Sequence, residues 1–89
     1  MTMNETLGNR IKQLRNAKGL TLAKLGEQVG SGASYLSQVE LGAIPSPSMV
    51  VNLATALDAE PADLLKLACA EKLEQLAARV KQRYLGKKR

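Results

Sequence analysis

Apolar residues recur along this chain at the three- and four-residue spacing of α-helices, in a series of short segments. Leu7, Ile11 and Leu14 follow one another at steps of four and three residues, which places them on one face of a first helix. Asn4 or Thr6 is placed to cap the start of that helix. No segment keeps the apolar–polar alternation of a half-buried strand. The pattern therefore predicts an all-α fold.

Residues 22–41 contain two short helices, over 22–29 and 33–41, joined by a tight turn at Gly30. Glycine adopts the left-handed backbone of such a turn at little cost. Gly26 stands one helical turn earlier, where a side chain would hold two steeply crossing helices apart. Two helices, a short glycine turn and a small residue at the crossing describe a helix-turn-helix.

Two further helices are predicted after this unit. One covers residues 47–57 and starts at Ser46-Pro47, a good N-cap followed by a proline at the first helical position. The other starts at Glu60-Pro61. We expect these helices to complete a DNA-binding domain over residues 1–69.

The pattern changes in residues 70–89, where we expect an additional C-terminal amphipathic helix with a basic tail. Its apolar positions are spaced like a coiled-coil seam, and the candidates for a dimer interface are Leu73, Leu76, Val80 and Tyr84. Two interpretations are open: the helix packs back on its own domain, or it forms the seam of a dimer.

Composition narrows the function classes. The chain has 89 residues, 45% of them apolar, which suits one small globular domain. It has no histidine and one cysteine, Cys69, so we expect no metal site, no cofactor and no histidine-based catalysis. There is no membrane-spanning run and no signal peptide. We therefore expect a cytoplasmic protein that is not an enzyme.

The net charge of +5 indicates a polyanionic partner, but the charge is unevenly distributed. Residues 1–20 carry +3 and residues 61–89 carry +5, whereas residues 21–60 carry −3. The helix-turn-helix is therefore in the least basic part of the chain. Attraction to a polyanion would come from its flanks.

The second helix of a helix-turn-helix enters the DNA major groove, and residues near its N-terminus reach the base edges. If Leu36 and Val39 are buried, the opposite face presents Ala33, Ser34, Ser37 and Gln38. The amide of Gln38 can pair with adenine through two hydrogen bonds, and Tyr35, at the edge of this face, is placed to meet a phosphate. The alternative is an ordinary polar surface.

Glu40 is an unfavourable residue for a helix that approaches phosphate groups. We expect it to be partly buried and to pair with Arg15 of the first helix through two hydrogen bonds. The alternative is a solvated glutamate without a structural role.

These residues resemble the Xre/Cro family of lambda-repressor-like DNA-binding domains of phage and bacteria. The matching segments are GLTLAKLGEQVG, SYLSQVELG and PSPSMVVNLATAL, within residues 5–67. The resemblance implies five helices, a homodimer on a palindromic operator and base contacts at the four positions named above. It also implies phosphate contacts at Thr21, Lys24 and Tyr35, and we add Arg10 of the basic first helix.

The sequence thus predicts a sequence-specific transcriptional regulator that binds double-stranded DNA, as a dimeric repressor or autoregulator on the bacterial or phage-type nucleoid. The chain ends at residue 89, so no small-molecule effector is expected. One alternative is the antitoxin of a toxin–antitoxin pair. Another is a protein-interaction module that keeps the fold without binding DNA.

Overall fold

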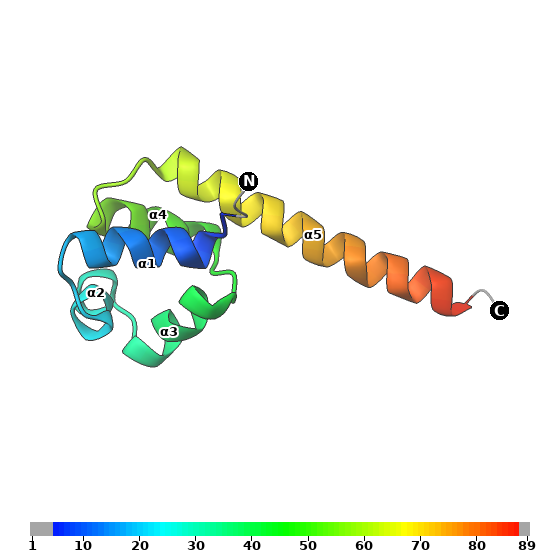
Figure 1. Ribbon diagram of the computed structural model, residues 1–89, viewed down its shortest axis with the longest axis horizontal. Helices are drawn as coiled ribbons and strands as arrows, with labels where there is room; N and C mark the ends of the chain where they lie inside the picture. The colour runs from blue at the N-terminus through cyan, green and yellow to red at the C-terminus, as the bar shows by residue number, and fades with distance from the viewer. Residues whose placement is uncertain (1–4, 88–89) are drawn as a thin grey trace.

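The computed structural model describes residues 5–87, and the side chains of residues 5–83. The described chain is all-α, as the sequence predicts, and consists of five helices (Figure 1). They are α1 (Leu7–Ala17), α2 (Leu22–Val29), α3 (Ala33–Leu41), α4 (Pro47–Ala56) and α5 (Pro61–Lys87). None of the helices in the described residues is long and apolar enough to span a membrane.

Short polar side chains begin three of the helices. Thr6, Thr21 and Ser46 are the N-caps of α1, α2 and α4, and each accepts a hydrogen bond from the backbone N–H three residues later, at 3.1, 3.1 and 3.3 Å. Asn4, the other candidate for the first cap, lies outside the described residues. The starts of these three helices agree with the prediction. They could be predicted because an N-cap depends only on neighbouring residues.

All five helices contribute to one apolar core. α4 packs against α5, α1 packs against both α3 and α5, and α2 packs against α3 and α4. The largest fully buried side chains are Leu7, Ile11, Leu25, Leu36, Val39, Val50, Leu53 and Leu64. Because these residues lie on one face of each helix, the core fixes how α2 and α3 are presented.

Two glycines allow close backbone contacts inside this core. A Cβ on Gly26 would collide with the carbonyl oxygen of Ser31, which belongs to the turn. The expectation that Gly26 makes room for a crossing helix was therefore wrong: it makes room for the turn itself. At the α1–α3 contact the close approach occurs at Gly8, where a Cβ would lie 2.6 Å from the carbonyl oxygens of Val39 and Glu40.

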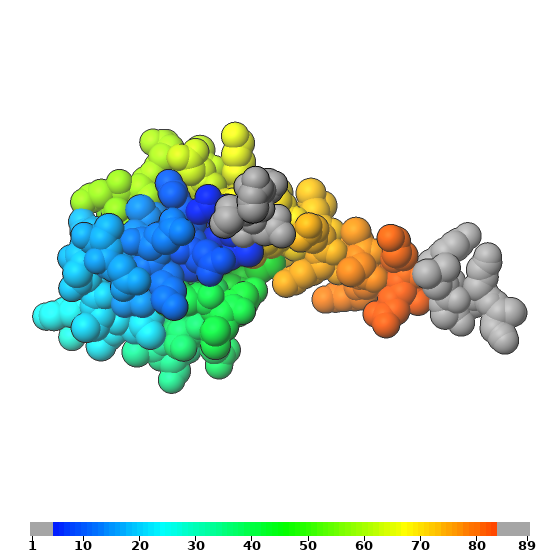
Figure 2. Space-filling view, in the orientation of Figure 1, coloured from blue at the N-terminus to red at the C-terminus, as the bar shows by residue number. Residues whose placement is uncertain are grey.

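The predicted C-terminal helix is not separate, because α5 continues through residue 70 without a break. Its first part is anchored by the buried Leu64 and Ala68, and the later part stands clear of the globular part (Figures 1 and 2). Leu73, Leu76 and Val80 are 62%, 40% and 61% exposed. The interpretation that this segment packs back on its own domain is therefore wrong for the described side chains.

Candidate nucleic-acid interface

The turn between α2 and α3 has the geometry that its glycines allow. Gly30 has φ +71° and closes α2 in the left-handed conformation. Its N–H and that of Ser31 both donate to the carbonyl oxygen of Gly26, the latter at 2.9 Å. The chain thus leaves α2 and enters α3 within three residues, and α3 lies at an outer edge of the molecule (Figure 1).

The buried face of α3 determines which side chains face solvent. Leu36 and Val39 are each 1% exposed. The four predicted base-contacting residues are accessible: Ser34 and Gln38 are exposed, and Ala33 and Ser37 are half-buried. They form a row on α3. Because three of these side chains are small and the fourth is an amide, another molecule with hydrogen-bonding groups could approach the helix closely along this row.

Three of the four predicted phosphate-contacting residues are accessible on α2 and α3. Thr21 lies at the N-terminus of α2 and Lys24 lies in its first turn, and both are exposed. Tyr35 of α3 is 37% exposed. The N-terminus of a helix presents free N–H groups and a positive dipole end, which suit a phosphate.

Arg10 does not join this surface. Its guanidinium is 3.8 Å from the carboxylate of Glu5, and it lies in a shallow hollow with Asp63 and Lys66 of α5. Arg10 and Arg15 are five residues apart, which separates them by about 140° around the helix. Because Arg15 faces α3, Arg10 faces a different side of the molecule.

The Arg15–Glu40 pair that the sequence predicts is present. Arg15 Nε donates to one carboxylate oxygen of Glu40 at 2.7 Å and Nη2 donates to the other at 3.1 Å. Nη1 donates to the carbonyl oxygen of Leu20 at 2.9 Å. The two side chains are only 12% and 8% exposed. The pair ties α1 to α3 and leaves no free carboxylate at position 40.

The pair also keeps Arg15 charged. Its hydrogen bond to Glu40 raises the pKa of the Arg15 guanidinium, burial lowers it, and the carboxylate charge raises it further, so that the net direction is upward. The guanidinium of Arg15 therefore stays protonated, as the ion pair with Glu40 requires.

Glu71 is a structural residue that the sequence analysis missed. Its carboxylate accepts a hydrogen bond from the backbone N–H of Leu7, at the first turn of α1, from 64 residues away. No local pattern indicates such a contact, because it depends on how α5 crosses α1. Gly8 was also missed, although an isolated glycine inside a helical pattern is a signal of close packing.

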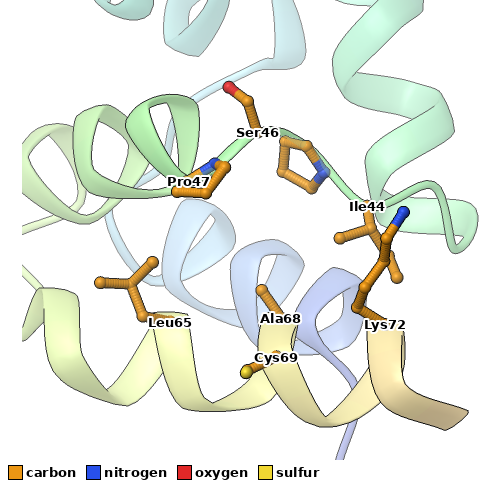
Figure 3. A pocket seen from close by; sticks show the side chains of 8 residues that line it. Ile44, Ser46, Pro47, Leu65, Ala68, Cys69 and Lys72 are labelled. Atoms are coloured by element: carbon orange, nitrogen blue, oxygen red, sulfur yellow. The ribbon is translucent and has the colours of Figure 1, made fainter.

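A groove runs between α5 and the segment that joins α3 to α4. It encloses about 440 Å³ and is mostly apolar (Figure 3). We call it the α5 groove; its lining residues are Ile44, Pro45, Ser46, Pro47, Leu65, Ala68, Cys69 and Lys72. The described residues contain no cluster of three or more His, Cys, Asp or Glu side chains that could hold a metal ion.

Residues 6–67 match the family model of a helix-turn-helix domain. The chain belongs to this family. The matched residues cover α1 to α4 and the start of α5, including the turn at Gly30 and the exposed row on α3. The family consists of Xre/Cro-like transcription regulators rather than enzymes.

Several members of the helix-turn-helix family are similar to this chain. The HTH-type transcriptional regulator SinR of Bacillus subtilis is 44% identical over 43 residues, which are 48% of this chain and 39% of SinR. The chain thus matches well under half the length of that regulator. The crystal structure of SinR in complex with DNA has 39% identity, covers 67% of this chain and 98% of that one, and has a TM-score of 0.62.

A restriction-modification controller protein of Aeromonas hydrophila, C.AhdI, has 42% identity and a TM-score of 0.61, covering 65% of this chain and 86% of its own. These similarities establish a helix-turn-helix domain of the kind found in DNA-binding transcription regulators.

Proposed function

We propose that the protein is a sequence-specific transcriptional regulator that binds double-stranded DNA with α3 in the major groove. The observation that carries the proposal is the accessible row on α3, a helix that the Arg15–Glu40 pair ties to α1. In this arrangement the row reads the base edges. Thr21, Lys24 and Tyr35 hold the phosphates on either side.

The charge distribution indicates that different parts of the chain contribute specificity and electrostatic attraction. Residues 21–60 carry −3, so α3 and its neighbours would contribute shape complementarity to DNA rather than electrostatic attraction. The basic residues of α1 and of the C-terminal segment supply the attraction, which weakens as salt rises because bound DNA releases counterions. The protein would act on the bacterial nucleoid, as a repressor or autoregulator.

The exposed face of α5 supports a dimer. Leu73, Leu76 and Val80 form an apolar stripe on α5 that the rest of the described chain leaves exposed. Position 84, a tyrosine, continues the stripe in the sequence, although its side chain lies outside the described residues. A homodimer on a palindromic operator would bury this stripe and place one α3 in each half-site.

The proposal is tested by selecting bound duplexes from a random library and then measuring Gln38→Ala on the selected operator and its single-base variants. Loss of two hydrogen bonds to adenine should weaken binding about 5- to 150-fold and remove discrimination at one position per half-site. Gln28→Ala, an exposed glutamine of α2 outside the row, should leave binding unchanged. Equal effects of both variants would refute the readout assignment.

The −3 charge of residues 21–60 favours one other candidate, a protein-interaction module that keeps the fold without DNA binding. Affinity for mixed duplex DNA measured against salt separates the two. DNA binding predicts a linear fall of log affinity with log salt concentration. Absence of binding at low salt would favour the interaction module.

A further inference from the structure

The exposed stripe of α5 and the α5 groove form one continuous surface. Cys69 lines the groove and also begins the stripe, because Leu73, Leu76 and Val80 follow it at steps of four, three and four residues. Leu65, one turn before Cys69, lies deeper in the groove beside Pro47 (Figure 3). No part of the described chain covers the stripe.

The spacing along this surface is symmetric. Leu73 and Leu76 are equidistant from a point between Glu74 and Gln75, and so are Cys69 and Val80. The same symmetry relates Leu65 to position 84. A face with this spacing matches a second copy of itself turned end for end, which is what an antiparallel two-fold interface requires.

We propose that α5 pairs with the α5 of a second copy in the antiparallel direction. The two-fold axis passes between Glu74 and Gln75, and Val80 of the partner subunit lies opposite Cys69 at the mouth of the groove. The proposal rests on the proposed function, because it specifies the dimer that would bind the operator.

The length of α5 agrees with this arrangement. Leu64, which anchors α5 in the core, would lie about 31 Å along the helix from the partner's Leu64, at about 1.5 Å per residue. The two halves of an operator are about 34 Å apart for one DNA turn. In a parallel pair the same two residues would be only about 8–10 Å apart.

The position of α3 also favours the antiparallel direction. α3 lies at the lower edge of the globular part, whereas α5 leaves it sideways (Figure 1). A parallel pair has its two-fold axis along α5, and rotation about that axis carries the second α3 to the opposite side. An antiparallel pair has its axis perpendicular to α5, as the dyad of an operator is perpendicular to the duplex.

The residues beside the stripe have different sizes and charges on its two flanks. Ala70 and Ala77 lie on one flank and would face the same residues of the partner, where their small side chains allow close approach. Lys72 and Arg79 lie on the other, which is the flank of the groove. Four cations of the dimer would therefore gather on one side, where they repel one another until a polyanion neutralises them.

Cysteine cross-linking of the full-length protein tests the direction. A disulfide needs Cα atoms about 4.4–6.8 Å apart, and in the antiparallel pair Cys69 meets position 80 of the partner rather than its own counterpart. Val80→Cys should therefore form a covalent dimer under mild oxidation, reversed by reductant. The wild type and the double variant Cys69→Ala with Val80→Cys should not. Lys81→Cys, exposed on another face, is the matched control and should not cross-link.

Each other outcome overturns the proposal in a recognisable way. Cross-linking of the wild type, or of the double variant, would show a parallel pair. A sedimenting dimer in which none of the variants cross-links would place the interface elsewhere. A monomer at all concentrations would refute the proposed dimer as well, while DNA binding, measured separately by gel shift, would show whether the reading function survives.

Discussion

At the scale of single residues, the Arg15–Glu40 pair fixes the position of α3 against α1. The two side chains are almost buried and share two hydrogen bonds. Glu40→Ala leaves the almost buried guanidinium of Arg15 without its carboxylate partner. This loss should lower the free energy of unfolding by about 3 kcal/mol. Thermal melts should show the melting temperature falling by on the order of 10–20 °C.

A double-mutant cycle identifies the cause. Arg15→Ala together with Glu40→Ala should cost less than the sum of the single changes, because no charge remains without its partner. The exposed pair of Lys18 and Asp58 provides the control; Lys18→Ala should cost under about 1 kcal/mol. Additive single costs would contradict the coupling.

For Gly26→Ala, the structure predicts a change in stability opposite in sign to the change that helix propensity predicts. Alanine in place of glycine inside α2 should gain about 1 kcal/mol from propensity. The added Cβ, however, meets the carbonyl oxygen of Ser31, and overpacking typically costs about 1–3 kcal/mol. We expect Gly26→Ala to lower stability in a urea titration. If it stabilises the protein as much as Ala23→Gly destabilises it, the turn does not limit the residue at position 26.

At the scale of helices, Glu71 connects α5 to the start of α1. Glu71→Ala removes the acceptor from the N–H of Leu7 and a negative charge from a helix N-terminus, so stability should fall by about 1–2 kcal/mol. Glu74→Ala, on the exposed part of α5, should change stability by less than about 0.5 kcal/mol. Equal melting temperatures of the two variants would contradict the connection.

The helices differ in how far the sequence could predict them. The starts of α1, α2 and α4 follow from Thr6, Thr21 and Ser46, because capping is a local interaction. The continuity of α5 was missed because its apolar pattern changes near residue 70 without any glycine or proline. The pattern changes there because the helix leaves the core, not because the helix ends.

The surface around α3 could be predicted in part from the sequence. Burial of Leu36 and Val39 follows from their spacing, and it fixes which side chains of α3 are accessible. The position of Arg10 beside α5 could not be predicted, because net charge does not say which side of α1 faces the turn. The isolated glycine at position 8 signals close packing, but the identity of its partner depends on tertiary packing. The hydrogen bond of Glu71 depends on tertiary packing as well, and no local pattern indicates it.

At the scale of the whole molecule, the stripe on α5 is the surface that the proposed dimer would bury. Leu76→Lys would place a charge in the proposed seam of both copies, and loss of two buried leucines should weaken the dimer by on the order of 100-fold or more. Sedimentation equilibrium measures this. Gln82→Lys, at an exposed position on another face of α5, should leave the dimer intact. An unaltered Leu76→Lys dimer would contradict the assignment.

The unbroken course of α5 has a mechanical consequence. A helix without a hinge between the domain core and the stripe behaves as a stiff arm. In the proposed dimer, the two α3 helices would therefore keep a fixed distance and a fixed rotation relative to each other. Each base pair added between half-sites turns one of them by about 34° around the duplex. The protein should therefore recognise the rotational phase of its half-sites as strictly as their sequence.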